Sequence, residues 1–164
     1  MTSFSMLGGA FAVAISVHNL EEAILLPKWS RSAGRWYPVV GAKEFRFAAI
    51  VLTLAAYACV ALSAAAVPLG DYLLCGYALA MAINVFVPHT FATLFFRRYV
   101  PGTLSALLLV LPASVLLLRA AFAEHRIEPE RFMWVGPLVA VALLLSIRPL
   151  FFLGRALSAT SERP

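Results

Sequence analysis

Five long apolar runs, separated by short polar segments, make up almost the whole of this chain. Each run reaches the roughly 20 residues that a helix needs to cross about 30 Å of hydrocarbon. We therefore predict an all-α bundle of five membrane-spanning helices in a single domain over residues 1–164. The predicted spans are 4–26, 45–67, 72–96, 103–123 and 132–153.

Proline and glycine residues mark several of the predicted helix ends. Pro27 follows the first span, and we expect it to end that helix. The sequence Pro-Leu-Gly-Asp at 68–71 predicts a tight turn between the second and third spans. Pro88 lies inside the third span, where we expect a kink, because proline cannot donate a backbone hydrogen bond and its ring crowds the preceding turn.

Composition supports the same class of protein. Of all residues, 62% are hydrophobic and 13% are charged, with a mean hydropathy of +0.89. Soluble domains are about half apolar and a quarter charged. The net charge of +5 does not indicate a nucleic-acid partner, because the basic residues lie between apolar runs. Cys59 and Cys75 fall inside predicted spans, which disfavours a disulfide or a thiolate metal site.

The loops differ in charge between the two sides of the predicted bundle. Segments 28–46 and 97–98 are strongly basic, whereas the other side carries Asp71 and the mixed-charge segment 124–131. Basic loops face the cytoplasm in most membrane proteins. We therefore predict an external N-terminus, a cytoplasmic C-terminus and a bacterial-type inner membrane, with membrane lipid as a partner.

Ionisable residues interrupt the apolar pattern of the first span. An ionisable side chain at the centre of such a helix costs roughly 2.5–3.5 kcal/mol on insertion scales. His18, Glu21 and Glu22 are three and four residues apart, so they share one helix face. The third span supplies Asn84 and His89. At 1.5 Å per residue, His18 and His89 lie about 12 and 10 Å from the same membrane face, which predicts a polar, cytoplasm-facing cavity between these helices.

The sequence His-Asn-Leu-Glu-Glu at 18–22 resembles the motif that defines the HXXEE family, small multi-helix membrane proteins of unknown function. In that family an Asn and a His in a later span, and a Tyr-x-Pro-Gly turn, accompany the motif. Asn84, His89 and the segment 99–102 are similar to those positions. The resemblance covers about residues 4–102. It implies a membrane location and a polar site, and it brings no established reaction.

The spacing of His18 and Glu22 is one by which a helix offers two ligands to one ion. Together with His89 they would form a set of two histidines and one carboxylate, which suits zinc or non-haem iron. We therefore predict a divalent metal held by these three residues, with Glu21 activating a bound water and Asn84 also in the catalytic site. The predicted function is metal-assisted hydrolysis of a lipid-like or small membrane-partitioned substrate.

Two other interpretations of the same residues stay open. Adjacent glutamates in a low dielectric cannot both ionise cheaply, so one of them is expected to hold a proton. A neighbouring histidine could then move that proton during proton-coupled transport, or during isomerisation of a bound hydrophobic ligand. Alternatively, the polar groups only hold the helices together, although interhelical polar pairs contribute about 0.6 kcal/mol on average.

Overall fold

A computed structural model describes residues 3–34 and 37–161, and every regular element in these ranges is a helix. The first two spans are α1 (Ser3–Ser32) and α2 (Ala42–Ala64), and the fifth is α7 (Pro129–Ser161). The third comprises α3 (Gly70–Asn84), the π-helical η2 (Val85–Thr90) and α4 (Phe91–Phe96). The fourth comprises α5 (Thr103–Ser105), the π-helical η3 (Ala106–Val110) and α6 (Leu111–Ala123). The five candidate spans, each long and apolar enough to cross a membrane, agree with the predicted number.

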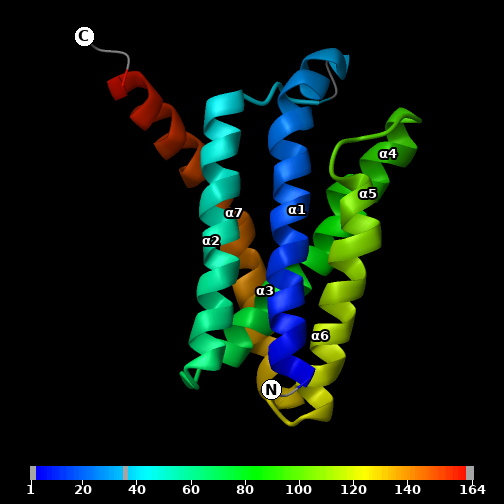
Figure 1. Ribbon diagram of the computed structural model, residues 1–164. Coiled ribbons are helices and arrows are strands. Elements are labelled where there is room, and N and C mark those ends of the chain that lie inside the picture. Colours follow the sequence, from blue (N-terminus) through cyan, green and yellow to red (C-terminus); the bar gives the residue numbers. More distant parts are fainter. Residues whose placement is uncertain (1–2, 35–36, 162–164) are drawn as a thin grey trace.

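The helices stand side by side in one bundle (Figure 1). Helices α1, α2, α3 and α6 contact one another in a ring, and α7 packs against α2 and α3. The C-terminal part of α7 leaves the bundle (Figure 1). The α1–α2 and α4–α5 connections lie together at one end, called here the basic end because it carries Lys28, Arg31, Arg97 and Arg98. At the opposite end, Arg126 pairs with Asp71 at 3.0 Å.

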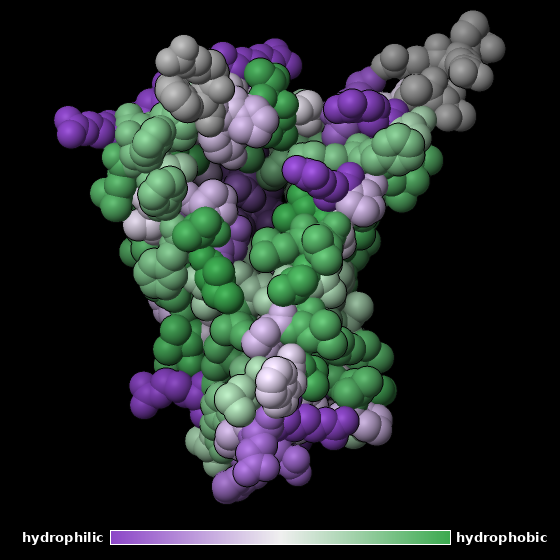
Figure 2. All heavy atoms as spheres, turned by 180° about the vertical axis from the view of Figure 1, so that it is seen from behind, coloured by the Kyte–Doolittle hydropathy of each residue, from purple (hydrophilic) through white to green (hydrophobic). Residues whose placement is uncertain are grey.

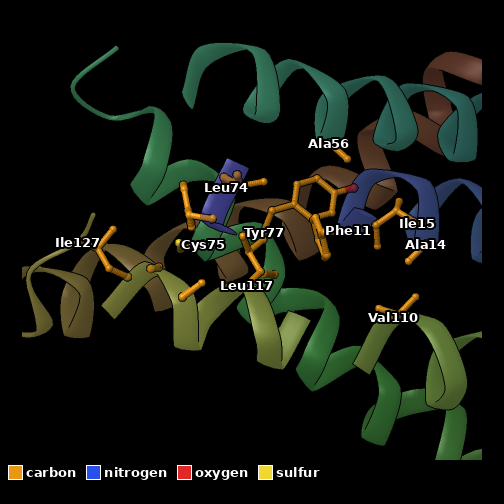
Figure 3. Close-up of a cluster of buried hydrophobic side chains, with 14 of the residues drawn as sticks. Phe11, Ala14, Ile15, Ala56, Leu74, Cys75, Tyr77, Val110, Leu117 and Ile127 are labelled. Atoms are coloured by element: carbon orange, nitrogen blue, oxygen red, sulfur yellow. The ribbon is translucent and has the colours of Figure 1, made fainter. Parts of the chain in front are cut away.

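Large apolar side chains fill the space between α1, α3 and α6 (Figure 3). Tyr77 of α3 meets Phe11 of α1 edge to face, with ring centroids 5.8 Å apart. Its hydroxyl donates to the backbone carbonyl of Leu52 in α2 at 2.9 Å, so the buried phenol keeps a hydrogen-bond partner. Leu74 and Leu117 pack in the same cluster and are almost fully buried. This core ties α1 to α2, α3 and α6.

Pro27 does not end the first helix, so that prediction is wrong: α1 continues to Ser32. A proline at position 27 leaves the carbonyl of Ala23 without its usual intrahelical donor. The Nε–H of Arg46 in α2 donates to this carbonyl at 3.3 Å. The interrupted ladder is therefore compensated by a neighbouring helix, and the helix continues through the proline.

The ends of the other predicted spans also shift by a few residues. Helix α2 begins and ends three residues before the predicted span 45–67. Its end is set by Ala66, which adopts a positive φ of 55°. The predicted tight turn before the third span is present: the N–H of Gly70 donates to the carbonyl of Val67 at 2.8 Å, and Gly70 and Asp71 then begin α3. Helix α7 extends beyond the predicted 132–153 at both ends, since polar flanking residues continue the helix.

The predicted kink in the third span is confirmed. Val87, directly before Pro88, has the non-helical angles φ −131° and ψ 111°. The hydroxyl of Thr90 donates to the carbonyl of Val85 at 2.7 Å, which compensates part of the disturbed backbone ladder. The chain changes direction here and His89 lies just after the change, buried against α1.

Candidate metal centre

His18, Glu22 and His89 come together from two different spans. One ligand atom of each residue lies within 4.8 Å of the other two. Glu22 bridges the histidines: its Oε2 is 3.5 Å from Nε2 of His18, and its Oε1 is 3.5 Å from Nε2 of His89. The imidazole rings meet edge to face with centroids 4.9 Å apart. Since the two histidine side chains are at most 4% exposed and that of Glu22 is 14% exposed, the group is largely shielded from its surroundings.

Gly102 forms a wall of this group. Its φ is +91°, a conformation that side chains rarely adopt. A Cβ at this position would lie 2.7 Å from Cε1 of His89 and 2.8 Å from Cγ of Glu22. The turn at 99–102, expected from the sequence as a fixed turn, therefore packs directly on two of the three candidate ligands. Only glycine both adopts this positive φ readily and leaves room for His89 and Glu22.

Glu21 faces the same connection and is not one of the three clustered ligands. Its carboxylate accepts hydrogen bonds from the hydroxyl of Tyr99, the backbone N–H of Gly102 at 2.9 Å and the hydroxyl of Ser105. Both of its oxygens therefore act as acceptors. This carboxylate attaches α1 to the start of the fourth span, immediately beside the group formed by His18, Glu22 and His89.

Ser105 links Glu21 to His18. Its single hydroxyl proton is donated to Glu21, and its Oγ lies 3.1 Å from Nδ1 of His18. The serine oxygen must then accept a hydrogen bond from the Nδ1–H of that imidazole. This fixes the tautomer in which Nε2 of His18 carries no proton and faces Glu22. Metal-binding histidines are typically oriented in this way by a second hydrogen bond to a neighbouring acceptor.

Sequence reasoning missed Ser105. The available signal was weak: a hydroxyl three residues after the Tyr-x-Pro-Gly turn, at the start of an otherwise apolar span. Tyr99, by contrast, belongs to the motif and is 47% exposed at the edge of the group. Desolvation, followed by its hydrogen bond to Glu21, raises the pKa of Tyr99 to about 12. The phenol therefore remains a hydrogen-bond donor to Glu21 across the physiological pH range.

The structure gives two asparagines roles that differ from the sequence interpretation. Asn84 is the last residue of α3 and is half-buried, and within the described ranges it makes no hydrogen bond to His18, Glu22 or His89. Asn19, inside the motif, was not singled out. Its amide donates to the hydroxyl of Thr53 at 2.8 Å and to the carbonyl of Ala49 at 3.3 Å, which fixes α1 against α2.

A double-mutant cycle can measure this helix contact. Because Asn19 and Thr53 hydrogen-bond across two spans, we expect Asn19→Ala and Thr53→Val to be coupled by about 0.6 kcal/mol, with an upper bound of about 1.7 kcal/mol. The free energy of unfolding in mild detergent, measured for both single variants and the double variant, gives this coupling. Strictly additive effects would show that the bond contributes nothing to stability.

The molecular surface near the basic end is hollowed on the face seen in Figure 2. Hydrophilic atoms lie at the bottom of this hollow, hydrophilic side chains border it toward the basic end, and apolar side chains border it on the side toward the middle of the bundle (Figure 2). Figure 2 therefore shows a polar recess in this face of the molecule, near the basic end.

Residues 10–117 match the family described as "Protein of unknown function with HXXEE motif". The chain belongs to the HXXEE family. It is also similar to the "Uncharacterized protein YrkK" of Bacillus subtilis (strain 168), with 36% identity over 145 residues that cover 87% of this chain and 90% of that protein. No solved structure matches the chain. Neither description names an activity, so a function for this HXXEE protein has to be argued from its own geometry.

Proposed function

We propose that this HXXEE protein is a membrane-embedded metalloenzyme in which His18, Glu22 and His89 hold a divalent metal, zinc or iron. The observation that supports it is the convergence of their ligand atoms within 4.8 Å, from two spans. Tetrahedral zinc with bonds of about 2.0–2.1 Å separates neighbouring ligand atoms by about 3.4 Å. The two distances of 3.5 Å between Glu22 and the histidines are close to that value.

The remaining residues support the ligands in this proposal. A bound divalent metal would supply a Lewis acid and an acidified water for hydrolysis. Ser105 holds His18 in the tautomer that presents Nε2, and Glu21 holds Ser105. Glu21 accepts three hydrogen bonds, two on Oε1 and one on Oε2, so Oε2 keeps a free lone pair for the role of base predicted from the sequence. Asn84, which makes no hydrogen bond to the cluster within the described ranges, remains a proposed substrate contact.

The proposed substrate is lipid-like or partitions into the membrane, since apolar side chains border the hollow in Figure 2 on the side toward the middle of the bundle. Hydrolysis of an ester or amide bond in such a molecule needs water, and the hydrophilic bottom of the hollow suits it. We further propose that the basic end faces the cytoplasm of a bacterial cell, following the usual distribution of Lys and Arg.

A second function is favoured by one specific observation. Hydrogen-bonding groups form a continuous chain from the exposed Tyr99 through Glu21 and Ser105 to His18. Glu22 continues this chain to His89. Such a chain can move a proton between the molecular surface and a buried site without any metal. The alternative proposal is therefore a proton-coupled carrier, or an isomerase for a hydrophobic ligand.

One experiment separates these proposals. Purified protein loaded with zinc or iron is incubated with a bacterial total lipid extract, and new products are detected by mass spectrometry. We expect hydrolysis products with the wild-type protein and with His125→Asn, an exposed position away from the cluster. Chelation or Glu22→Ala should abolish them. If no product forms, and proteoliposomes show a pH-dependent flux that survives chelation, the metalloenzyme proposal is refuted in favour of the carrier.

A further inference from the structure

A groove of about 370 Å³ runs between α1 and α2, apart from the group formed by His18, Glu22 and His89. Ala23 and Ala49 line it, and their small side chains leave room between the two helices. From Ser16 to Ile24 along α1 it extends over about 12 Å, at 1.5 Å per residue. Four large apolar side chains, each 59–62% exposed, form its walls: Leu20, Ile24, Ile50 and Leu54.

The polar groups inside this groove already have partners within the protein. The Asn19 amide donates to the Thr53 hydroxyl, which in turn donates to the carbonyl of Ala49 at 2.8 Å. The Ser16 hydroxyl is bonded to the carbonyl of Ala12 at 2.8 Å and lies 3.2 Å from the hydroxyl of Tyr57. The groove therefore needs no polar ligand along its length and suits a hydrocarbon chain.

Arg46 lines the groove at the basic end. Its Nε–H donates to the Ala23 carbonyl that Pro27 leaves without an intrahelical donor, which fixes one side of the guanidinium. Among the residues that the structure describes, its two terminal NH₂ groups have no hydrogen-bond partner. An arginine fork of this kind binds a phosphate through two parallel hydrogen bonds. Lys28 and Arg31, both exposed near the same end, add positive potential.

We propose that the α1–α2 groove binds an anionic phospholipid of the leaflet at the basic end, with one acyl chain along the groove and the phosphate on Arg46. The apolar groove matches the acyl chain of such a lipid, and the Arg46 guanidinium at its end matches the phosphate. Basic pockets between transmembrane helices bind anionic head groups in this manner. A second copy of the chain fits less well, because a twofold axis along the membrane normal would place both Arg46 guanidinium groups at the same depth.

Native mass spectrometry of the full chain tests this proposal. The protein is released from vesicles that contain phosphatidylglycerol and phosphatidylcholine with identical acyl chains. We expect a roughly fivefold preference for retained phosphatidylglycerol, the size given by one basic residue near a membrane surface. Arg46→Gln should abolish this preference, whereas Arg31→Gln, which removes an equal charge outside the groove, should preserve it. Ala23→Leu should lower retention of both lipids by filling the groove.

Three results would overturn the proposal. Equal preference for phosphatidylglycerol in Arg46→Gln and wild type would mean that the charge of the whole basic end, and not the groove, selects the lipid. A dimer of the protein without retained lipid would mean that a second copy of the protein occupies the groove. Competition by glycerol 3-phosphate alone should be ineffective, since it lacks the acyl chain; full displacement of the lipid would refute the role of the groove. A melting temperature close to that of the wild-type protein establishes that each variant is folded.

Discussion

Replacing Gly102 by alanine should lower the affinity of the protein for zinc or iron at least tenfold and destabilise the fold. The φ of +91° would impose a backbone cost of about 1–3 kcal/mol on any residue with a side chain. In addition, the new methyl group would lie 2.7 Å from His89 and 2.8 Å from Glu22, so one of these candidate ligands has to move. Competition with a chromogenic chelator measures the affinity, and thermal unfolding measures the stability.

Gly34→Ala is the matched control for this substitution. Gly34 also has a positive φ, +75°, but a Cβ there would meet no atom within 4 Å. The Gly34→Ala variant should therefore lose stability only through backbone strain and keep its affinity for the metal. Equal affinities in Gly102→Ala and Gly34→Ala would show that the turn does not shape the site.

Ser105→Ala should reduce metal affinity by roughly 10–100-fold, the range typical of groups that orient a metal ligand. The variant removes the hydroxyl between Nδ1 of His18 and the carboxylate of Glu21. Without that acceptor the buried imidazole loses its fixed tautomer and orientation. The fold should persist, since the change leaves the surrounding apolar contacts in place. The same chelator competition measures this effect.

Ser114→Ala provides the comparison within the same span. Ser114 is fully buried, and its Oγ has no hydrogen-bond partner among the described residues, so its removal should leave metal affinity unchanged. If Ser105→Ala and Ser114→Ala bind metal equally well, the hydrogen bonds that join Glu21, Ser105 and His18 have no function in metal binding.

The sequence predicted the parts of this protein that depend on helix periodicity and depth. The spacing of His18 and Glu22 places them on one face of any helix. The similar depth of His18 and His89 below one membrane face predicted that His89 would lie near them, as it does. The kink at Pro88 followed from the missing backbone donor. Helix ends were less predictable: Pro27 would end a helix that had no neighbour, and only the tertiary contact with Arg46 explains its continuation.

Contacts made by the turn at 99–102 could not be read from periodicity. They depend on the positive φ of Gly102, which carries Ser105 over α1 so that it reaches both Glu21 and His18. The role of Asn19 depends in the same way on which helix packs against that side of α1. Asn19 faces α2 and is held by Thr53, a contact that no pattern within one span reveals.

The most direct test asks whether two spans share one ion. Metal content of the detergent-purified protein is measured by mass spectrometry for the wild type, His18→Ala, Glu22→Ala, His89→Ala and the control His125→Asn. We predict close to one zinc or iron per chain in the wild type and the control, and its loss in each of the three ligand variants. Absence of metal in the wild type after incubation with excess zinc or iron, or metal retained by His89→Ala, would contradict the proposed centre.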